Sequence, residues 1–165
     1  MHFELDQWIA GAPAAVAAAF ADPRYYATLG ALPKLGTPEV VSHSVDGDVV
    51  LLEVRYRFTG DLSSAVKAVI DPRKLTWVER STHDLAAQQV TYELRPDHYP
   101  DRLRCRGSYR FGAHGDGTVR HTEGDLKVRA PLVAGAVEGA IVSGLREHLE
   151  AEAGHIERFL HQPTA

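Results

Sequence analysis

The sequence has little cysteine, no long apolar run and no excess of positive charge. Cys105 is the single cysteine among 165 residues, so an internal disulfide is excluded. No apolar run approaches the roughly eighteen residues of a membrane span, and residues 1–10 carry acidic side chains where a secretion signal needs Lys or Arg. We therefore expect a soluble protein of a reducing, cytoplasmic compartment that is not integral to a membrane.

The charge balance and the missing motifs limit the function classes further. The chain has 18 Lys and Arg against 22 Asp and Glu, and this net charge of -4 argues against nucleic acid as a partner. It contains no glycine-rich phosphate loop, no G-x-S-x-G elbow and no clear metal-ligand spacing, so we expect no cofactor and no metal. The length predicts a single domain over residues 1–162, followed by a short tail at 163–165.

The hydrophobic pattern changes its period along the chain and predicts a strand, two short helices, six strands and a long helix. Asp46-Gly47 is the clearest hairpin signal, because a type I′ turn needs positive φ at both central residues. Residues 60–71 fit either a helical turn or an extended edge. The expected strands cover 2–10, 39–45, 48–58, 74–82, 88–95, 102–111 and 118–129, and the short helices cover 13–21 and 24–32.

A long amphipathic helix is predicted from Pro131 to His161. Pro131 suits the first helical position, because its φ is already helical and its missing N–H has no intrahelical partner there. The helix contains four glycines, each costing about 1 kcal/mol relative to alanine, which indicates close packing, a bend or room for a ligand. Its apolar stripe is formed by Val133, Val137, Ile141, Leu145, Leu149, Ile156 and Phe159.

The order of these elements, together with several short segments, resembles the START-like (SRPBCC, Bet v 1 type) helix-grip superfamily. More narrowly it resembles an actinobacterial family, domain of unknown function 2505 (DUF2505). The resemblance implies an α+β fold in which a seven-stranded curved antiparallel sheet wraps around the C-terminal helix over a hydrophobic cavity. It implies no established activity and no catalytic residues. The segments that carry it are Phe3-Glu4-Leu5, the helix start at 12–16, Trp77, residues 107–111, 123–128 and 131–138.

Two charged residues are expected inside the sheet. Glu79 and Arg120 each share the face of their strand's apolar residues, and a buried carboxylate must be paired or protonated. They are weak catalytic candidates, and the alternative is a structural ion pair or an exposed strand end. The residues predicted to line the cavity are Val54, Tyr56, Phe58, Trp77, Glu79, Tyr92, Cys105, Tyr109, Arg120, Val137, Ile141 and Leu145.

Three further groups have simpler interpretations. His148, Glu152 and His155 share one helical face and include one Glu-x-x-His spacing, but we interpret them as a solvated charged face. The second group is a stripe of arginines on the outward face of one strand. Across the next hairpin, Glu123 should lie opposite Arg106, and Asp125 opposite Arg104. We therefore expect cross-strand charge pairs rather than a site for an anion or a membrane surface. The stripe comprises Arg102, Arg104, Arg106 and Arg110.

Val49 and Leu51 lie on the charged side of their strand. They can form a contact patch, so a homodimer stays an open interpretation.

The leading hypothesis is a binding protein for a hydrophobic or lipid-like small molecule between helix and sheet. The first alternative is a cyclase-, aromatase- or hydrolase-type enzyme that uses the inward Glu, Arg and Tyr side chains. The second is an interaction domain whose core is filled. We prefer binding over catalysis because no catalytic motif is present, and the volume of the cavity separates the third hypothesis from the other two.

Overall fold

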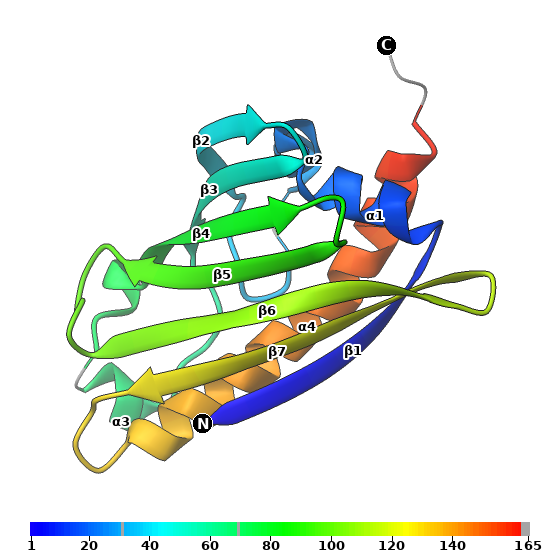
Figure 1. Cartoon of the computed structure of the whole chain (residues 1–165). Coiled ribbons are helices and arrows are strands. Elements are labelled where there is room, and N and C mark those ends of the chain that lie inside the picture. Colours follow the sequence, from blue (N-terminus) through cyan, green and yellow to red (C-terminus); the bar gives the residue numbers. More distant parts are fainter. Residues whose placement is uncertain (31, 69, 163–165) are drawn as a thin grey trace.

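The computed structural model describes residues 1–30, 32–68 and 70–162, so the predicted tail at 163–165 lies outside the described residues, as do Ala31 and Val69. It consists of one seven-stranded antiparallel sheet wrapped around a long C-terminal helix, in the order β1-β7-β6-β5-β4-β3-β2 (Figure 1). The predicted helix-grip architecture is therefore confirmed. The strands are β1 (His2–Ala10), β2 (Glu39–Asp46), β3 (Val49–Arg57), β4 (Thr76–Asp84), β5 (Gln89–Pro96), β6 (Leu103–His114) and β7 (Gly117–Val128).

Two short helices follow β1, as predicted, and a third lies between β3 and β4. The Asp22 side chain caps the second helix by accepting a hydrogen bond from the Arg24 N–H. This helix ends at Thr28, short of the predicted Leu32, because Leu29 already has an extended backbone. The helical interpretation of residues 60–71 holds for part of that range. The short helices are α1 (Pro13–Phe20), α2 (Pro23–Thr28) and α3 (Ser64–Lys67), and a 3-10 turn, η1, covers Pro72–Lys74.

The long helix α4 spans Ala134–Leu160, so the prediction that it begins at Pro131 is wrong. Leu132 has a φ of 67°, a left-handed conformation that cannot belong to a right-handed helix. Residues 131–133 instead form the turn that redirects the chain from β7 onto the concave face of the sheet. Pro131 therefore marks the reversal, and the helix starts once the chain has been turned.

The hairpins fix which side chains face inward. The first hairpin turns at Gly47 and Asp48, because Asp46 still pairs with Val49 in the sheet. Gly47 has the expected positive φ, 57°, but Asp46 does not, so the predicted turn at Asp46-Gly47 is wrong by one residue. The last hairpin turns at Gly115 and Asp116, which places Asp125 opposite Arg106, Glu123 opposite Ser108, and Lys127 opposite Arg104. The predicted pairing of this hairpin is wrong by two residues, because the turn is centred one residue later than expected.

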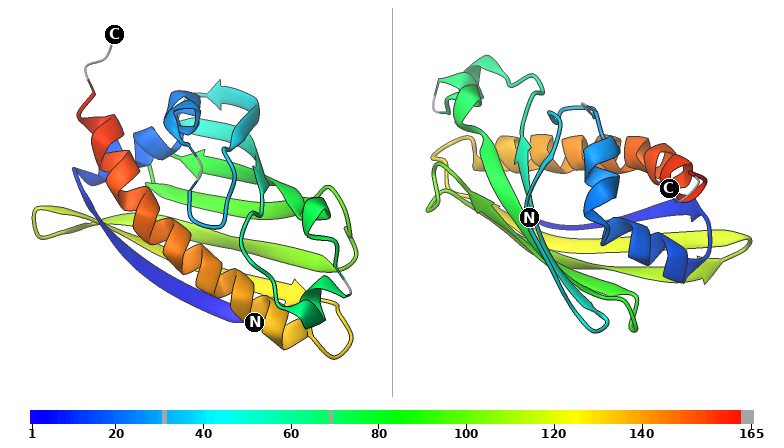
Figure 2. Two further views of the ribbon diagram at one scale, coloured as in Figure 1. Left: turned by 180° about the vertical axis from the view of Figure 1, so that it is seen from behind. Right: turned by 90° about the horizontal axis from the view of Figure 1, so that it is seen from above.

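The core lies between the concave face of the sheet and α4. Figure 2 shows α4 crossing this face along its length, with α1 near its C-terminal end and α3 near its N-terminal end. One packed cluster centres on α1, α2 and the strands near them, with Phe20, Tyr25 and Ile156 nearly fully buried. A second cluster contains Phe3, Leu126 and Val137 at the other end of the helix.

Candidate functional site

A cavity of about 220 Å³ lies between the concave face of the sheet and α4. Its wall is mostly apolar and takes residues from both packed clusters, with Tyr56, Trp77 and Tyr109 on the sheet side and Ile141 and Leu145 on the helix side. The connection between β3 and β4, which carries α3, covers part of one end.

The residues predicted to line the cavity are on its wall, with the exception of Val54. Val54 faces inward as expected, but only 2% of it is exposed, and its short side chain is enclosed in the packed cluster beside Tyr56. The structure places the other predicted residues on the wall of the cavity, but their contact with a ligand remains a prediction.

A close approach between strands shapes the wall near Tyr92. The Tyr92 hydroxyl donates to the Glu123 carbonyl oxygen across β6 at 3.3 Å. A Cβ atom at either Gly107 or Gly124 would lie 2.6 Å from this hydroxyl oxygen, so both positions require glycine. The glycines thus leave room for the Tyr92 side chain, which lines the cavity, to reach across β6 to β7.

Arg120 forms a buried ion pair with Glu152 of α4 rather than with Glu79. Its guanidinium Nη2 is 2.7 Å from the Glu152 carboxylate, and the two residues are 3% and 5% exposed. The guanidinium also lies over the Phe20 ring, with 4.4 Å to the centroid. Arg120 is inward as predicted, but its partner comes from the helix face that the sequence pattern indicates as solvated.

The interpretation of His148, Glu152 and His155 as a solvated face is therefore wrong. His148 and Glu152 are buried against the sheet, with His148 Nε2 3.9 Å from Glu152 Oε1, while His155 is half-buried. Burial lowers the pKa of His148, so the imidazole is held neutral. The face is buried because Arg120 supplies the counter-charge that a helix carboxylate needs inside a core.

Glu79 faces the cavity and is half-buried. Burial, together with the nearby negative charge of Glu152, raises its pKa to about 7, and the positive charge of Arg120 opposes this only in part. Within the described part of the chain, no ion pair or hydrogen bond holds its carboxyl group. Glu79 is thus a carboxyl group that changes charge near neutral pH on the wall of an apolar cavity.

Three buried polar atoms on the cavity wall have no hydrogen-bond partner among the described residues. They are Arg120 Nε, Thr122 Oγ1 and His148 Nδ1. Arg120 is a member of the ion pair, His148 lies beside Glu152, and Thr122 is two residues from Arg120 on β7. Buried polar groups are normally satisfied by protein, water or ligand. This end of the cavity can therefore accept a polar group, such as a hydroxyl or carbonyl, while the remainder accepts an apolar body.

Other chemistry on the wall is limited. Burial raises the pKa of the Cys105 thiol to about 12 and raises the pKa values of Tyr56 and Tyr109, so all three are neutral hydrogen-bonding groups. Across residues 1–30, 32–68 and 70–162, no cluster of three or more His, Cys, Asp or Glu side chains is placed to hold a metal ion.

A membrane-crossing helix is not found: none of the helices in the described ranges has the length and apolarity needed.

Solved structures of other proteins have the same fold. The aromatase/cyclase Zhui from Streptomyces sp. R1128 is 16% identical, with a TM-score of 0.67 over 98% of this chain and 96% of that chain. Norcoclaurine synthase from Thalictrum flavum is 17% identical, with a TM-score of 0.63 over 99% of this chain and 87% of that one. A START superfamily protein from Mycobacterium smegmatis is 15% identical, with a TM-score of 0.60 over 96% and 98%.

A comparison with curated proteins gave no match. The structural likenesses establish the START-like, helix-grip fold that the element order predicted. The sequence comparison is more specific, because the profile of the family described as "Protein of unknown function (DUF2505)" matches residues 4–160. This match covers nearly the whole chain, and the protein therefore belongs to the DUF2505 family.

Proposed function

We propose that this protein binds a hydrophobic small molecule in the cavity between the sheet and α4. The observation that carries the proposal is the cavity itself: an apolar space of about 220 Å³, walled by aromatic side chains, that a fully packed core would not leave. Ligand pockets commonly measure about 300 to 1,000 Å³. The present volume fits a small ligand, or the inner part of a longer one that extends through the mouth.

The polar end of the cavity supports a ligand with a hydrogen-bonding group on the part that reaches this end. Arg120 Nε can donate to it, and Thr122 Oγ1 can donate or accept. The charge of Arg120 is already balanced by Glu152, so this end favours a neutral hydroxyl or carbonyl over an ion.

Two measurements test binding. Organic extraction of the purified protein followed by mass spectrometry should recover a small molecule, and the apolar dye Nile red should bind with a fluorescence increase. Ile141→Trp, which fills the cavity from α4, should abolish dye binding. Val45→Trp, at a position 61% exposed on β2, is the matched control and should leave it unchanged. Extracts that are repeatedly empty, together with no dye binding, would contradict the proposal.

A second candidate function is enzymatic, of the cyclase type. Glu79 favours it, since a carboxyl group with a pKa near the working pH suits general acid–base catalysis. Two of the structural neighbours are described as an aromatase/cyclase and a synthase, which is a statement about those proteins.

Proton exchange on a bound carbon acid tests this candidate. An apolar bicyclic ketone such as 2-decalone should exchange its α-hydrogens with D₂O faster in the presence of protein, with a rate that titrates near pH 7. Glu79→Gln should remove the acceleration while Nile red still binds. Equal exchange rates for the native protein and Glu79→Gln would rule out Glu79 as the base.

A further inference from the structure

Positive side chains surround the opening of the cavity. Wall residues that are also solvent-exposed mark the opening, and the charged or titratable members of this group are all basic. The carboxylates on the wall are less accessible than these exposed residues, since Glu152 is 5% exposed and Glu79 is half-buried. This distribution contrasts with the net charge of -4 for the whole chain. The basic residues at the opening are Lys34, which is one-third exposed, and the exposed Lys74, His98, Arg102 and Arg129.

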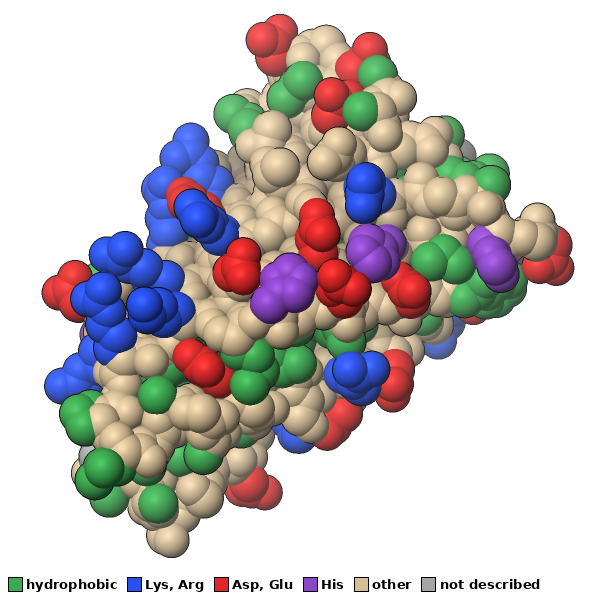
Figure 3. Space-filling view, turned by 60° about the horizontal axis from the view of Figure 1, so that its bottom comes forward, with side chains coloured by type: hydrophobic (Ala, Val, Ile, Leu, Met, Phe, Trp, Pro, Cys, Tyr) green, Lys and Arg blue, Asp and Glu red, His purple; other side chains and the backbone are tan. Residues whose placement is uncertain are grey.

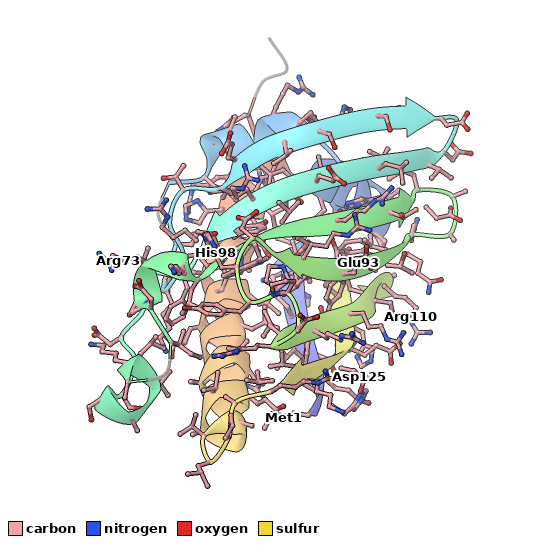
Figure 4. The ribbon with its side chains drawn as sticks, turned by 90° about the vertical axis from the view of Figure 1, so that its left-hand side faces the viewer. Met1, Arg73, Glu93, His98, Arg110 and Asp125 are labelled. Atoms are coloured by element: carbon pink, nitrogen blue, oxygen red, sulfur yellow. The ribbon has the colours of Figure 1, made fainter. Side chains whose placement is uncertain are left out.

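The fold brings most of these residues to one end of the sheet. Lys74 lies two residues before β4, His98 and Arg102 lie between β5 and β6, and Arg129 follows β7. In an antiparallel sheet these four positions share an end. The Arg129 N–H donates to the Arg102 carbonyl oxygen at 2.7 Å, which fixes the two arginines next to each other. Figure 4 shows His98 at this end, and Figure 3 shows Lys and Arg side chains gathered at one edge of the molecule.

The carboxylates of the neighbouring segments mostly pair with residues other than Lys74, Arg102 and Arg129. Glu147 pairs with Lys34 at 2.7 Å. Asp71 pairs with Arg73 at 3.0 Å, and Asp97 pairs with Arg55 at 3.3 Å.

Three cations at the opening therefore remain unpaired. Within the described residues, Lys74, Arg102 and Arg129 have no carboxylate within 4.0 Å, although Asp101 precedes Arg102 in the chain. Arg102 instead places its guanidinium 5.4 Å from the centre of the Tyr99 ring, which also lines the cavity. These cations are available to a ligand that enters the cavity.

We propose that the ligand is an anionic amphiphile whose apolar body fills the cavity and whose carboxylate or phosphate lies at the opening against Arg102, Arg129 and Lys74. The inference rests on the proposed binding function and adds the chemical class and orientation of the ligand. The head group points outward because Arg120 at the inner end is already neutralised by Glu152, and an ionised Glu79 repels a second anion there. Arginine guanidinium groups also match the geometry of carboxylate and phosphate oxygens.

A matched series of twelve-carbon amphiphiles tests the proposal. Dodecanoate, dodecyl phosphate, dodecanol and dodecyltrimethylammonium compete with Nile red, each below its micelle concentration. We expect one or both anions to bind at least about tenfold more tightly than the cation, with a preference that weakens as salt rises, since exposed charges are screened. The comparison of dodecanoate with dodecyl phosphate distinguishes a carboxylate ligand from a phosphate ligand.

A second experiment reverses the charge of the arginines at the opening. Arg102→Glu combined with Arg129→Glu should lower the affinity for the preferred anion about tenfold or more and leave that for dodecanol unchanged. Arg110→Glu, on the face of the sheet turned away from α4 in Figure 4, is the control and should change neither. All of these positions are exposed, and a thermal melt of each variant confirms that it is folded.

The outcomes separate the two proposals. Equal affinities for all four head groups, unchanged in the double variant, would overturn the anionic ligand and leave the binding function standing. A failure of every amphiphile and of Nile red to bind would instead contradict the binding function itself. If the double variant loses association with phosphatidylglycerol vesicles but binds both anions normally, the cations serve a membrane surface and the proposal is wrong.

Discussion

Removal of one partner from the Arg120–Glu152 pair should be costly. Both residues are at least 95% buried and their charged atoms are 2.7 Å apart, so Glu152→Gln leaves a cation in a site that water does not reach. Breaking a buried pair in this way typically costs about 3 to 5 kcal/mol. The Phe20 ring, 4.4 Å from the guanidinium, still stabilises the cation by up to about 2 kcal/mol. We therefore expect Glu152→Gln to lower the free energy of unfolding by about 2 to 4 kcal/mol.

A double-mutant cycle measures the pairing itself. Arg120→Met keeps most of the packing against Phe20 and Tyr109 and should cost a similar amount, because it leaves Glu152 without its cation. The double variant should lose at least about 2 kcal/mol less than the sum of the two single variants, since it leaves no unpaired charge. Urea unfolding at pH 7 measures the free energy of unfolding of each variant, and the variants can be compared when the slope of this free energy against urea concentration is unchanged. Additive losses, or a loss below about 1 kcal/mol for Glu152→Gln, would refute this reasoning.

Three other predictions concern the cavity and the helix. Leu145 is half-buried on the cavity wall, so Leu145→Ala should lower the free energy of unfolding by less than about 2 kcal/mol. Ile156 is fully buried in the packed cluster, so Ile156→Ala should lower it by about 2 to 5 kcal/mol. Equal losses in urea melts would mean that Leu145 is packed. Gly139→Ala has nothing within 4 Å of the new Cβ and should gain about 0.5 to 1 kcal/mol, so a loss would reveal a contact made by this glycine. Cys105, with its pKa raised to about 12, should react with iodoacetamide at pH 8 at least about 100-fold more slowly than glutathione, and a comparable rate would contradict its burial.

The strands could be predicted because one face of the sheet is buried and the other is solvated. That arrangement imposes a period of two on the sequence, and the period alone is enough to assign Tyr109, Arg120 and Glu79 to the inner face. The start of α4 could not be predicted in the same way. Pro131 fits both a helix start and a chain reversal, and the left-handed Leu132 that decides between them is set by the path of the chain from β7.

The sequence contains a signal for the partner of Arg120 that the hydrophobic pattern alone does not reveal. The apolar stripe of α4 has a gap of seven between Leu149 and Ile156, which leaves one turn of the buried face without an apolar residue. Glu152 fills that turn, three residues after Leu149 and four before Ile156. An inward arginine on a strand and a carboxylate in a gap of the buried stripe are each unfavourable alone. Together they predict an ion pair between helix and sheet.

Two titratable groups, the half-buried Glu79 and the buried His83, should have opposite effects on stability as the pH changes. The pKa of Glu79 is raised from 4.5 to about 7, so its protonated form contributes stability that is fully present below pH 4.5 and lost as the pH rises through 7. The pKa of His83 is lowered from 6.5 to about 4 by burial, so its neutral form contributes stability that is present above pH 6.5 and lost as the pH falls to 4. Each contribution is about 2 to 3 kcal/mol. Between pH 4.5 and 6.5 one contribution falls as the other rises, so their effects on the pH dependence of stability should largely cancel.

Glu79→Gln should remove the contribution of Glu79 to the pH dependence of stability. The variant should gain about 2 to 3 kcal/mol over the native protein at pH 8, where the native carboxyl is ionised in the cavity, and little at pH 4, where it is protonated. Its own stability should then fall on acidification through the His83 range, because the opposing contribution of Glu79 is absent. Urea melts of both proteins at pH 4, 6 and 8 measure the difference, to which unrelated titrating groups contribute equally. A difference that does not depend on pH would mean that the Glu79 carboxyl reaches water and keeps an ordinary pKa, which would also remove the basis for assigning it a role in acid–base chemistry.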